Sequence, residues 1–202
     1  MCLLFFYINR RANVNQYKLI LVNNRDEFYS RPAEKSQIWG SNPRIVSGVT
    51  SSSFNKVLCL LEKILHFSSK NVEIANQVGK VAIWLGASET GKISCLLNIF
   101  QPIDAFKQNT TGRGFLALNF LQNNFSSQDY VNTIKESNIN YNLFNLLLLE
   151  YRRNSYEALY FNNVDNTSTN LDTDVVHGFG NCLISNDFKK IEKGKEFFWG
   201  GY

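Results

Sequence analysis

Paired cysteines and clustered histidines are the first features that this sequence lacks. It contains only two histidines, and its four cysteines stand far apart at Cys2, Cys59, Cys95 and Cys182, without a Cys-x-x-Cys spacing. A structural zinc site needs paired ligands at short spacing, and a disulfide scaffold needs a higher density of cysteine. We therefore expect no metal site, no disulfide framework and a reducing, cytosol-type compartment.

Long apolar runs, a basic stripe and a glycine-rich nucleotide loop are also missing. No apolar run approaches the roughly 20 residues that cross a bilayer, and no short apolar segment follows a basic start as in a signal peptide. The 21 basic and 17 acidic residues give a net charge of +4, with the basic pairs scattered along the chain. We expect no transmembrane segment, no nucleic-acid partner and no cofactor. The acid-free segment 8–18, with Arg10 and Arg11, leaves a mitochondrial targeting role open.

The apolar content is sufficient for a substantial core. Apolar residues make up 44% of the 202 residues and charged residues 19%, which favours one folded domain over residues 1–202. Three strand pairs are predicted, at 2–8 with 17–22, 80–88 with 91–100, and 142–151 with 155–163. Helices are predicted at 55–67, 112–125, 126–137 and 187–199, the last interrupted by Gly194. Antiparallel strands with segregated helices indicate the α+β class.

Three further expectations concern the remaining segments. The first strand pair has no clean alternation of apolar and polar residues, so we expect burial on both of its faces. Polar loops are predicted at 23–43 and 163–174. Residues 175–185 are predicted to form a short strand that runs into a turn.

Cys2 is the residue with the most distinctive chemistry. If Met1 is removed, its thiol and a free α-amine share one carbon, and the amine can act as the base that activates the thiol. Such a nucleophile needs a carboxylate near the amine, and Asp26 lies just beyond the strand that pairs with the strand of Cys2. The alternative is that Cys2 is a small core residue and Asp26 a turn residue. Cys59, Cys95 and Cys182 lie in apolar runs and are expected to be inert core thiols.

The motifs around Cys2 resemble the transport and Golgi organisation protein 2 family, also called the NRDE family. The tetrapeptide is Asn24-Arg25-Asp26-Glu27, and it follows "MCLLFF" and "YKLILV" in the order found in the family. Looser matches follow in the same order, namely "RP", "WG", "IVSG", "WLG", "GKISCLLN", "GRGFL", "FNLLLLE" and "GFGN".

The resemblance implies a four-layer αββα sandwich of the N-terminal-nucleophile hydrolase type. On that pattern Cys2 is the nucleophile, Asp26 holds the freed amine, and Asn181 in "GFGN" donates to the oxyanion. The pattern also puts Asn24, Arg25 and Arg113 forward as binding residues. Each has a plain alternative: a turn residue for Asn24, a surface ion pair for Arg25, and an exposed arginine at a helix start for Arg113.

The chain departs from the family pattern in three ways. It has Val81-Ala82-Ile83 where the family carries Gly-Gly-Thr, residues 51–80 read as an atypical insertion, and the family domain is expected to be incomplete at its C-terminus. Because catalysis tolerates misplaced groups less well than binding does, these departures favour a trafficking role. That role is Golgi organisation, protein secretion and the handling of a small apolar or acyl ligand, such as haem or an acyl-CoA. The alternative is a cysteine hydrolase that cleaves amide or thioester bonds. We expect a cytoplasmic protein, with Golgi or mitochondrial association open.

Overall fold

The computed structural model describes residues 2–26, 36–40, 42–50, 57–59, 82–106, 110–185 and 188–199. Within these residues the strands form two antiparallel sheets. The smaller sheet has the order β11-β1-β2-β5 and the larger sheet the order β10-β9-β8-β7-β6-β4-β3. The strands are β1 Leu3–Ile8, β2 Leu19–Asn24, β3 Gln37–Trp39, β4 Ile45–Thr50, β5 Val57–Cys59, β6 Ala82–Ser88, β7 Lys92–Asn98, β8 Phe144–Arg152, β9 Ser155–Asn162, β10 Ser168–Leu171 and β11 Val176–Phe179.

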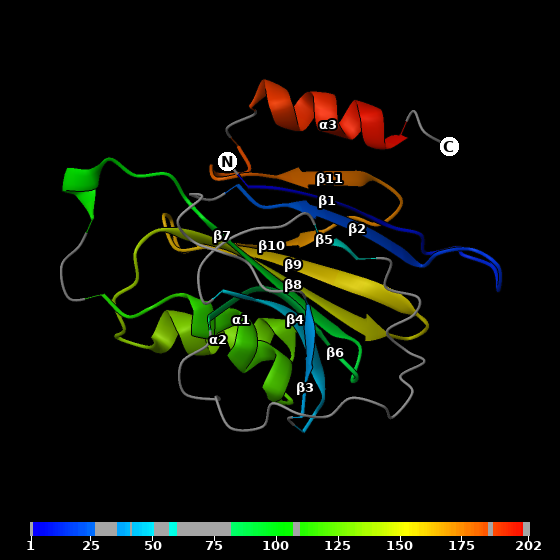
Figure 1. Ribbon diagram of the computed structural model, residues 1–202, viewed down its shortest axis with the longest axis horizontal. Coiled ribbons are helices and arrows are strands. Elements are labelled where there is room, and N and C mark those ends of the chain that lie inside the picture. Colours follow the sequence, from blue (N-terminus) through cyan, green and yellow to red (C-terminus); the bar gives the residue numbers. More distant parts are fainter. Residues whose placement is uncertain are drawn as a thin grey trace.

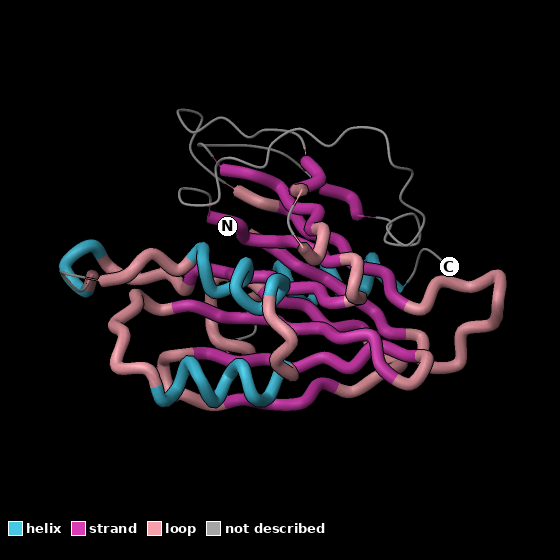
Figure 2. Tube along the Cα trace, turned by 90° about the horizontal axis from the view of Figure 1, so that it is seen from below, coloured by secondary structure: helices cyan, strands magenta, loops and turns pink. Residues whose placement is uncertain are grey.

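Three α-helices cover the outer faces of the two sheets in the described part of the chain. They are α1 Gly114–Gln122, α2 Ser127–Glu136 and α3 Lys189–Trp199, and a short 3-10 turn lies at Ile103–Ala105. Figure 1 shows α3 on the smaller sheet, and Figure 2 shows α1 and α2 across the far face of the larger sheet. Figure 1 shows the layers in the order helix, sheet, sheet, helix, and the predicted α+β class is confirmed. The finer assignment to the N-terminal-nucleophile hydrolase type stays a prediction from the resemblance.

Two apolar cores separate these layers. One lies between the sheets and combines residues of β1, β2 and β11 with residues of β6 to β9. The other lies between the larger sheet and the helices α1 and α2. β8 contributes to both cores, and its residues Phe144–Glu150 are all buried. A strand that is buried on both faces is mostly apolar, which explains the leucine run of β8 between the buried polar residues Asn145 and Glu150.

The three predicted hairpins are confirmed, and each joins neighbouring strands. β1 pairs with β2, β6 with β7, and β8 with β9. The expected burial of the first hairpin on both faces is wrong in detail, because buried and half-buried residues alternate along β1 and β2. Leu4, Phe6 and Ile8 face the core between the sheets, and Phe5 points toward α3, where it lies against Gly194.

The predicted helices α1 and α2 are confirmed, and the start of α2 has the expected cap. The hydroxyl of Ser126 accepts a hydrogen bond from the backbone N–H of Asp129 at 3.1 Å. Asp129 also lies in the first turn of the helix, where a carboxylate interacts favourably with the free N–H groups.

The helix predicted at 55–67 is wrong at its start. Residues 57–59 form β5, which pairs with β2 at the edge of the smaller sheet. A short apolar run does not distinguish a helix from a buried strand, and pairing with β2 gives these residues backbone hydrogen bonds. Residues 60–67 lie outside the described part of the chain.

Three other expectations are corrected. Gly194 does not interrupt the last helix, since α3 runs unbroken from Lys189 to Trp199. The segment 163–174 is not only loop, because it contains β10, which pairs with β9. The segment 23–43 contains β3, which pairs with β4, and neither strand was predicted.

Candidate functional site

The start of β1 is where three distant parts of the chain meet. The ends of β2 and β11 pair with the first residues of β1 from opposite sides. Residues that follow either strand therefore lie close to Cys2. Asp26 follows β2, and Asn181 follows β11.

Cys2 is half-buried and contacts both flanking segments. Its backbone nitrogen donates to the side-chain oxygen of Asn181 at 2.6 Å. Its Sγ lies 3.8 Å from the backbone carbonyl oxygen of Asp26. Removal of Met1 would turn this nitrogen into an α-amine, so the structure brings together a thiol, the nitrogen beside it and two polar partners.

The carboxylate of Asp26 lies beside the amino terminus of the chain. A hydrogen bond from the terminal α-ammonium group, followed by the charge of that group, lowers the pKa of Asp26. Desolvation opposes this shift, and the charge of Lys190 in α3 adds to it. The terminal ammonium group belongs to Met1, one residue before Cys2. Asp26 is therefore ionised at neutral pH, and its contact with a freed amine of Cys2 stays a prediction.

Asn181 presents its carbonyl oxygen to Cys2, not its NH2 group. The NH2 group donates to the backbone oxygen of Asn98, the last residue of β7, at 2.5 Å. In this arrangement Asn181 holds the nitrogen of Cys2, whereas an oxyanion donor would have to offer its N–H. Its role as an oxyanion donor stays a prediction.

Arg25 and Asn24 lie next to Asp26 at the exit of β2. The guanidinium carbon of Arg25 lies 4.2 Å from the centre of the Trp84 ring, so the two planar groups interact as cation and aromatic face. Trp84 is buried in the core between the sheets. Asn24 closes β2 opposite Leu3.

Arg113 has a different environment from the other five candidate residues. Its Nη1 donates to the backbone oxygen of Leu143 at 2.7 Å, and burial lowers the pKa of its guanidinium group. The contact ties the start of α1 to the start of β8. Among the described contacts, none links Arg113 to Cys2.

The other thiols and His177 are structural. Cys95 is fully buried, and burial, followed by the charge of Cys2, raises the pKa of its thiol. Cys182 is also buried, whereas the side chain of Cys59 lies outside the described part. His177 stacks on Phe6 with ring centres 4.9 Å apart.

Two residues that contact Asn181 were missed in the sequence. Asn98 receives the NH2 group of Asn181, and the backbone nitrogen of Phe100 donates to the backbone oxygen of Asn181 at 2.8 Å. The side chain of Phe100 is 82% exposed. An exposed aromatic residue is therefore tied through its backbone to the residue that contacts Cys2, an arrangement that only the fold produces.

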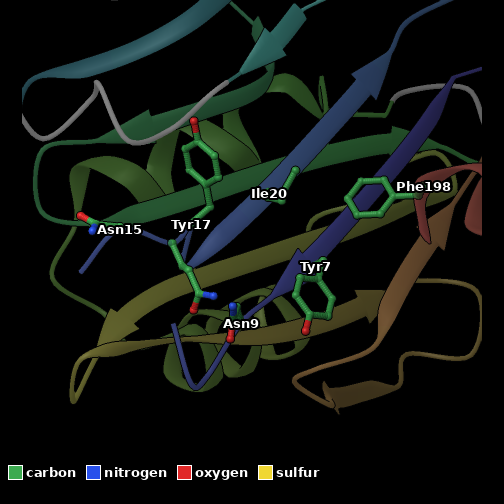
Figure 3. Close-up of a pocket in the computed structure, with 7 residues that line it drawn as sticks. Tyr7, Asn9, Asn15, Tyr17, Ile20 and Phe198 are labelled. Atoms are coloured by element: carbon green, nitrogen blue, oxygen red, sulfur yellow. The ribbon is translucent and has the colours of Figure 1, made fainter. Parts of the chain in front are cut away.

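A pocket of about 420 Å³ lies at the opposite end of the β1–β2 hairpin (Figure 3). From Cys2 to Tyr7 the strand covers about 16 Å, at roughly 3.3 Å per residue, so this pocket is separate from the site at Cys2. It is lined by aromatic, aliphatic and amide side chains without a charged group: Tyr7, Asn9, Asn15, Gln16, Tyr17, Ile20 and Phe198.

The described residues offer no metal-binding cluster and no membrane-spanning helix. No group of three or more His, Cys, Asp or Glu side chains comes together among them. None of the helices in this part of the chain is long and apolar enough to cross a bilayer.

Known proteins share this sequence pattern over nearly its whole length. A family model described as Transport and Golgi organisation 2 matches residues 1–56 and 67–199. The chain belongs to this family. The match includes Cys2, the Asn24–Asp26 segment, Arg113 and Asn181, and it passes over residues 57–66, within the segment read as an insertion.

Individual members of the family have similar sequences. The Transport and Golgi organization protein 2 homologs of Bos taurus and Homo sapiens are each 30% identical over 200 residues, 98% of this chain and 63% of their own length. Transport and Golgi organization protein 2 of Drosophila melanogaster is 25% identical over 209 residues, 98% of this chain and 64% of its own. The chain therefore spans less than two thirds of the length of these relatives.

Proposed function

We propose that this chain acts in transport and Golgi organisation by binding the acyl group of a lipid-derived ligand at the start of β1. The observation that carries the proposal is the backbone hydrogen bond from Phe100 to Asn181, which ties a residue with an exposed aromatic ring to the residue whose side chain accepts from the nitrogen of Cys2. An acyl thioester or amide has the same two parts, an apolar tail and a polar carbonyl group. The printed names of the relatives support the cellular role.

The proposed ligand is held at both of its parts. The tail lies on Phe100, whose exposed ring gains from leaving water. The head lies among Cys2, Asn181 and Asp26. The charge of Arg25, stacked on Trp84 next to Asp26, favours a ligand with an anionic head group such as an acyl-CoA. Haem, which is also flat, apolar and carboxylate-bearing, is the alternative ligand.

A titration with a fluorescent acyl-CoA analogue tests the binding. Phe100→Ser is expected to weaken binding about tenfold, because burial of an aromatic ring contributes roughly 1.5 to 3 kcal/mol. The matched control is Phe197→Ser, since Phe197 is equally exposed, at 81% against 82%, but lies in α3 near the other end of the hairpin. Equal effects of the two substitutions, or no saturable binding, would contradict the proposal. A Soret band that shifts on addition of the protein to haem would favour the alternative ligand.

Hydrolysis of an amide or thioester is the second candidate, favoured by the contact of Cys2 with Asn181 and the nearby Asp26. The thiolate of Cys2 would attack the acyl carbon, and the S–C bond would form as the bond to the leaving group breaks. The α-ammonium group would give its proton to the departing amine or thiol. Water would then release the carboxylic acid and restore the thiol.

Mass spectrometry separates this candidate from binding alone. Removal of Met1 is required, so the intact mass of the purified protein must lack that residue. Incubation with an acyl thioester should then add the acyl mass to Cys2, and Cys2→Ser should abolish the adduct. A retained Met1, or an acyl adduct that survives in Cys2→Ser, would leave binding as the function.

A cytoplasmic site of action, with Golgi or mitochondrial association, belongs to the same proposal.

A further inference from the structure

A buried asparagine lies beneath the turn that carries Asn181. Asn145 is 1% exposed and stands in β8, in register with Leu97 of β7. Leu97 belongs to the core between the sheets, and residues opposite each other in a sheet share a face. Asn145 therefore points its amide into an apolar core, where a polar group is unfavourable unless it is hydrogen-bonded.

Both ends of the Asn145 amide are hydrogen-bonded, and its donor end holds the turn after β11. Its NH2 group donates to the backbone oxygen of Gly180 at 3.2 Å and to that of Cys182 at 2.7 Å. These two residues flank Asn181 directly in the sequence. One side chain of the larger sheet thus hydrogen-bonds to the turn after β11 on both sides of Asn181, the residue that contacts Cys2.

The acceptor end of the same amide is fixed by Tyr160 of β9. The hydroxyl of Tyr160 donates to Oδ1 of Asn145 at 2.7 Å, and burial raises the pKa of Tyr160 to about 12. The hydroxyl is therefore protonated and available as a donor at neutral pH. If the amide were reversed, its oxygen would face the carbonyl oxygens of Gly180 and Cys182. Only one orientation of Asn145 satisfies all three partners.

We infer that Asn145, oriented by Tyr160, is a positioning residue for the Cys2 site, because it fixes the turn that presents Asn181 to the nitrogen of Cys2. This inference rests on the proposed function of that site. Loss of the hydrogen bonds from Asn145 to Gly180 and Cys182 lets the side-chain oxygen of Asn181 move away from the backbone nitrogen of Cys2. An oxygen that accepts from an ammonium group favours the charged amine, and a charged amine next to the thiol favours the thiolate. The hydrogen bonds from Asn145 thereby set the reactivity of the Cys2 thiol.

The pH profile of Cys2 alkylation by iodoacetamide measures this effect in protein freed of Met1 by methionine aminopeptidase. Within the described part of the chain, Asp26, Lys190 and Cys95 are titratable groups that act on this end of β1, and all three stay unchanged in the variants. Tyr160→Phe removes the hydroxyl that orients Asn145, and Asn145→Leu removes the amide that donates to Gly180 and Cys182. We expect the midpoint of the profile to move up by about half a pH unit for Tyr160→Phe and about one unit for Asn145→Leu.

Tyr130→Phe is the matched control for the loss of a buried hydroxyl. Tyr130 is also buried, and its hydroxyl donates to the backbone oxygen of Leu116 at 2.7 Å on the other face of the larger sheet. It should leave the profile of Cys2 unchanged. Labelling of the buried Cys95 reports unfolding, and a variant counts only while that thiol stays protected.

Asn181→Ala and the titration of Phe100→Ser separate failure of this inference from failure of the proposed function. If Asn181→Ala moves the profile and Tyr160→Phe and Asn145→Leu do not, the positioning role is overturned and the site stands. If Asn181→Ala itself leaves the profile unchanged, the Cys2–Asn181 contact does not tune the thiol and this inference fails at its premise, whereas the proposed acyl binding is decided separately by the titration of Phe100→Ser. Equal shifts for Tyr160→Phe and Tyr130→Phe would reduce the effect to general loosening and also overturn the inference.

Discussion

Lys92 and Glu150 face each other across β7 and β8, and each holds the end of a different helix. The ammonium group of Lys92 donates to the backbone oxygens of Asn123 and Phe125, just beyond α1, at 2.5 and 2.6 Å. Glu150 accepts from the backbone N–H and the hydroxyl of Ser127, the first residue of α2, at 2.7 and 2.8 Å. Two charged side chains in the larger sheet thus anchor the corner between the two helices.

Replacement of Lys92 should destabilise the protein strongly. Lys92→Met keeps the length of the side chain but leaves the backbone oxygens of Asn123 and Phe125 without this donor and the buried Glu150 without its cationic neighbour, so we expect the free energy of unfolding to fall by about 1 to 3 kcal/mol. Urea denaturation measures this loss. Lys18→Met is the control, because Lys18 is only half-buried and its partners at Tyr151 and Asn154 are exposed. Similar losses for both lysines would refute the anchoring role.

Gly194 should not tolerate a side chain, although it lies within a helix. A methyl group there would stand 2.1 Å from the ring of Phe5. In an open helix, Gly→Ala stabilises by about 1 kcal/mol, whereas here the overlap should make Gly194→Ala destabilising by about 1 to 3 kcal/mol. Gly112→Ala, where nothing lies within 4 Å of the added methyl group, should be close to neutral in the same thermal unfolding experiment. A stabilised Gly194→Ala variant would mean that α3 does not pack on β1 as described.

Cys2 should be alkylated before Cys95 and Cys182 in the folded protein. Cys2 is half-buried, whereas the other two are buried, and burial raises the pKa of Cys95. Because the thiolate is the reactive form, we expect a rate difference of at least about tenfold, measured by peptide mass spectrometry after brief iodoacetamide treatment. Preferential labelling of Cys95 would place Cys2 in the core and end its candidacy as a nucleophile.

Asp26→Asn should lower the pKa of the α-amine of Cys2 once Met1 is removed. A nearby negative charge favours the ammonium form, so its loss makes the amine easier to deprotonate. Selective ¹³C labelling of cysteine lets NMR follow this titration through the Cβ resonance of Cys2. Asp165→Asn is the control, because the pKa of Asp165 is also lowered, but by hydrogen bonds from Thr167 and Asn162. An unchanged amine pKa in Asp26→Asn would leave Cys2 without its predicted carboxylate partner.

The stability of the protein should decrease as the pH falls, with a contribution from His177. Burial lowers the pKa of His177 below its usual 6.5, the carbonyl of Asp172 opposes this shift, and the charge of Lys195 adds to it. The unfolded chain therefore takes up a proton more readily than the folded protein, so acid favours unfolding. His177→Phe keeps the stack on Phe6 and removes the proton. Between about pH 7 and about pH 5, the free energy of unfolding should fall less steeply in this variant than in the original protein. Parallel slopes would contradict this.

The strands that pair with a chain neighbour could be predicted from the sequence, and those that pair across a long interval could not. The hairpins β1–β2, β6–β7 and β8–β9 have apolar runs on both sides of a turn, so local pattern is enough. β5 pairs with β2 across a long stretch of chain, and its apolar residues fit a helix equally well. Glycine is a helix-breaking residue type, so Gly194 was expected to interrupt α3. The reason for a glycine at this position is the contact with Phe5, which lies near the opposite end of the sequence.

The residues of the candidate site also fall into those that local sequence predicts and those that depend on distant strand pairing. Cys2 and Asp26 were predictable because the hairpin that joins them is local. Asn181 was named only through resemblance, and its contact with Cys2 depends on β11 pairing with β1. Asn145 carried one signal, a polar residue inside the leucine-rich run of β8. That pattern does not reveal which distant carbonyl groups it binds.

The pairing of β1 with β11 also has a consequence for the newly made chain. Cys2 and Asn181 are separated by 179 positions. At the usual synthesis rate of about 5 to 20 residues per second, Cys2 leaves the ribosome roughly 9 to 36 s before its partner. Throughout that interval the first residues have no β11 to pair with, and the amino end stays accessible to a ribosome-bound aminopeptidase. The contact between Asn181 and the nitrogen of Cys2 therefore forms only after β11 has been made.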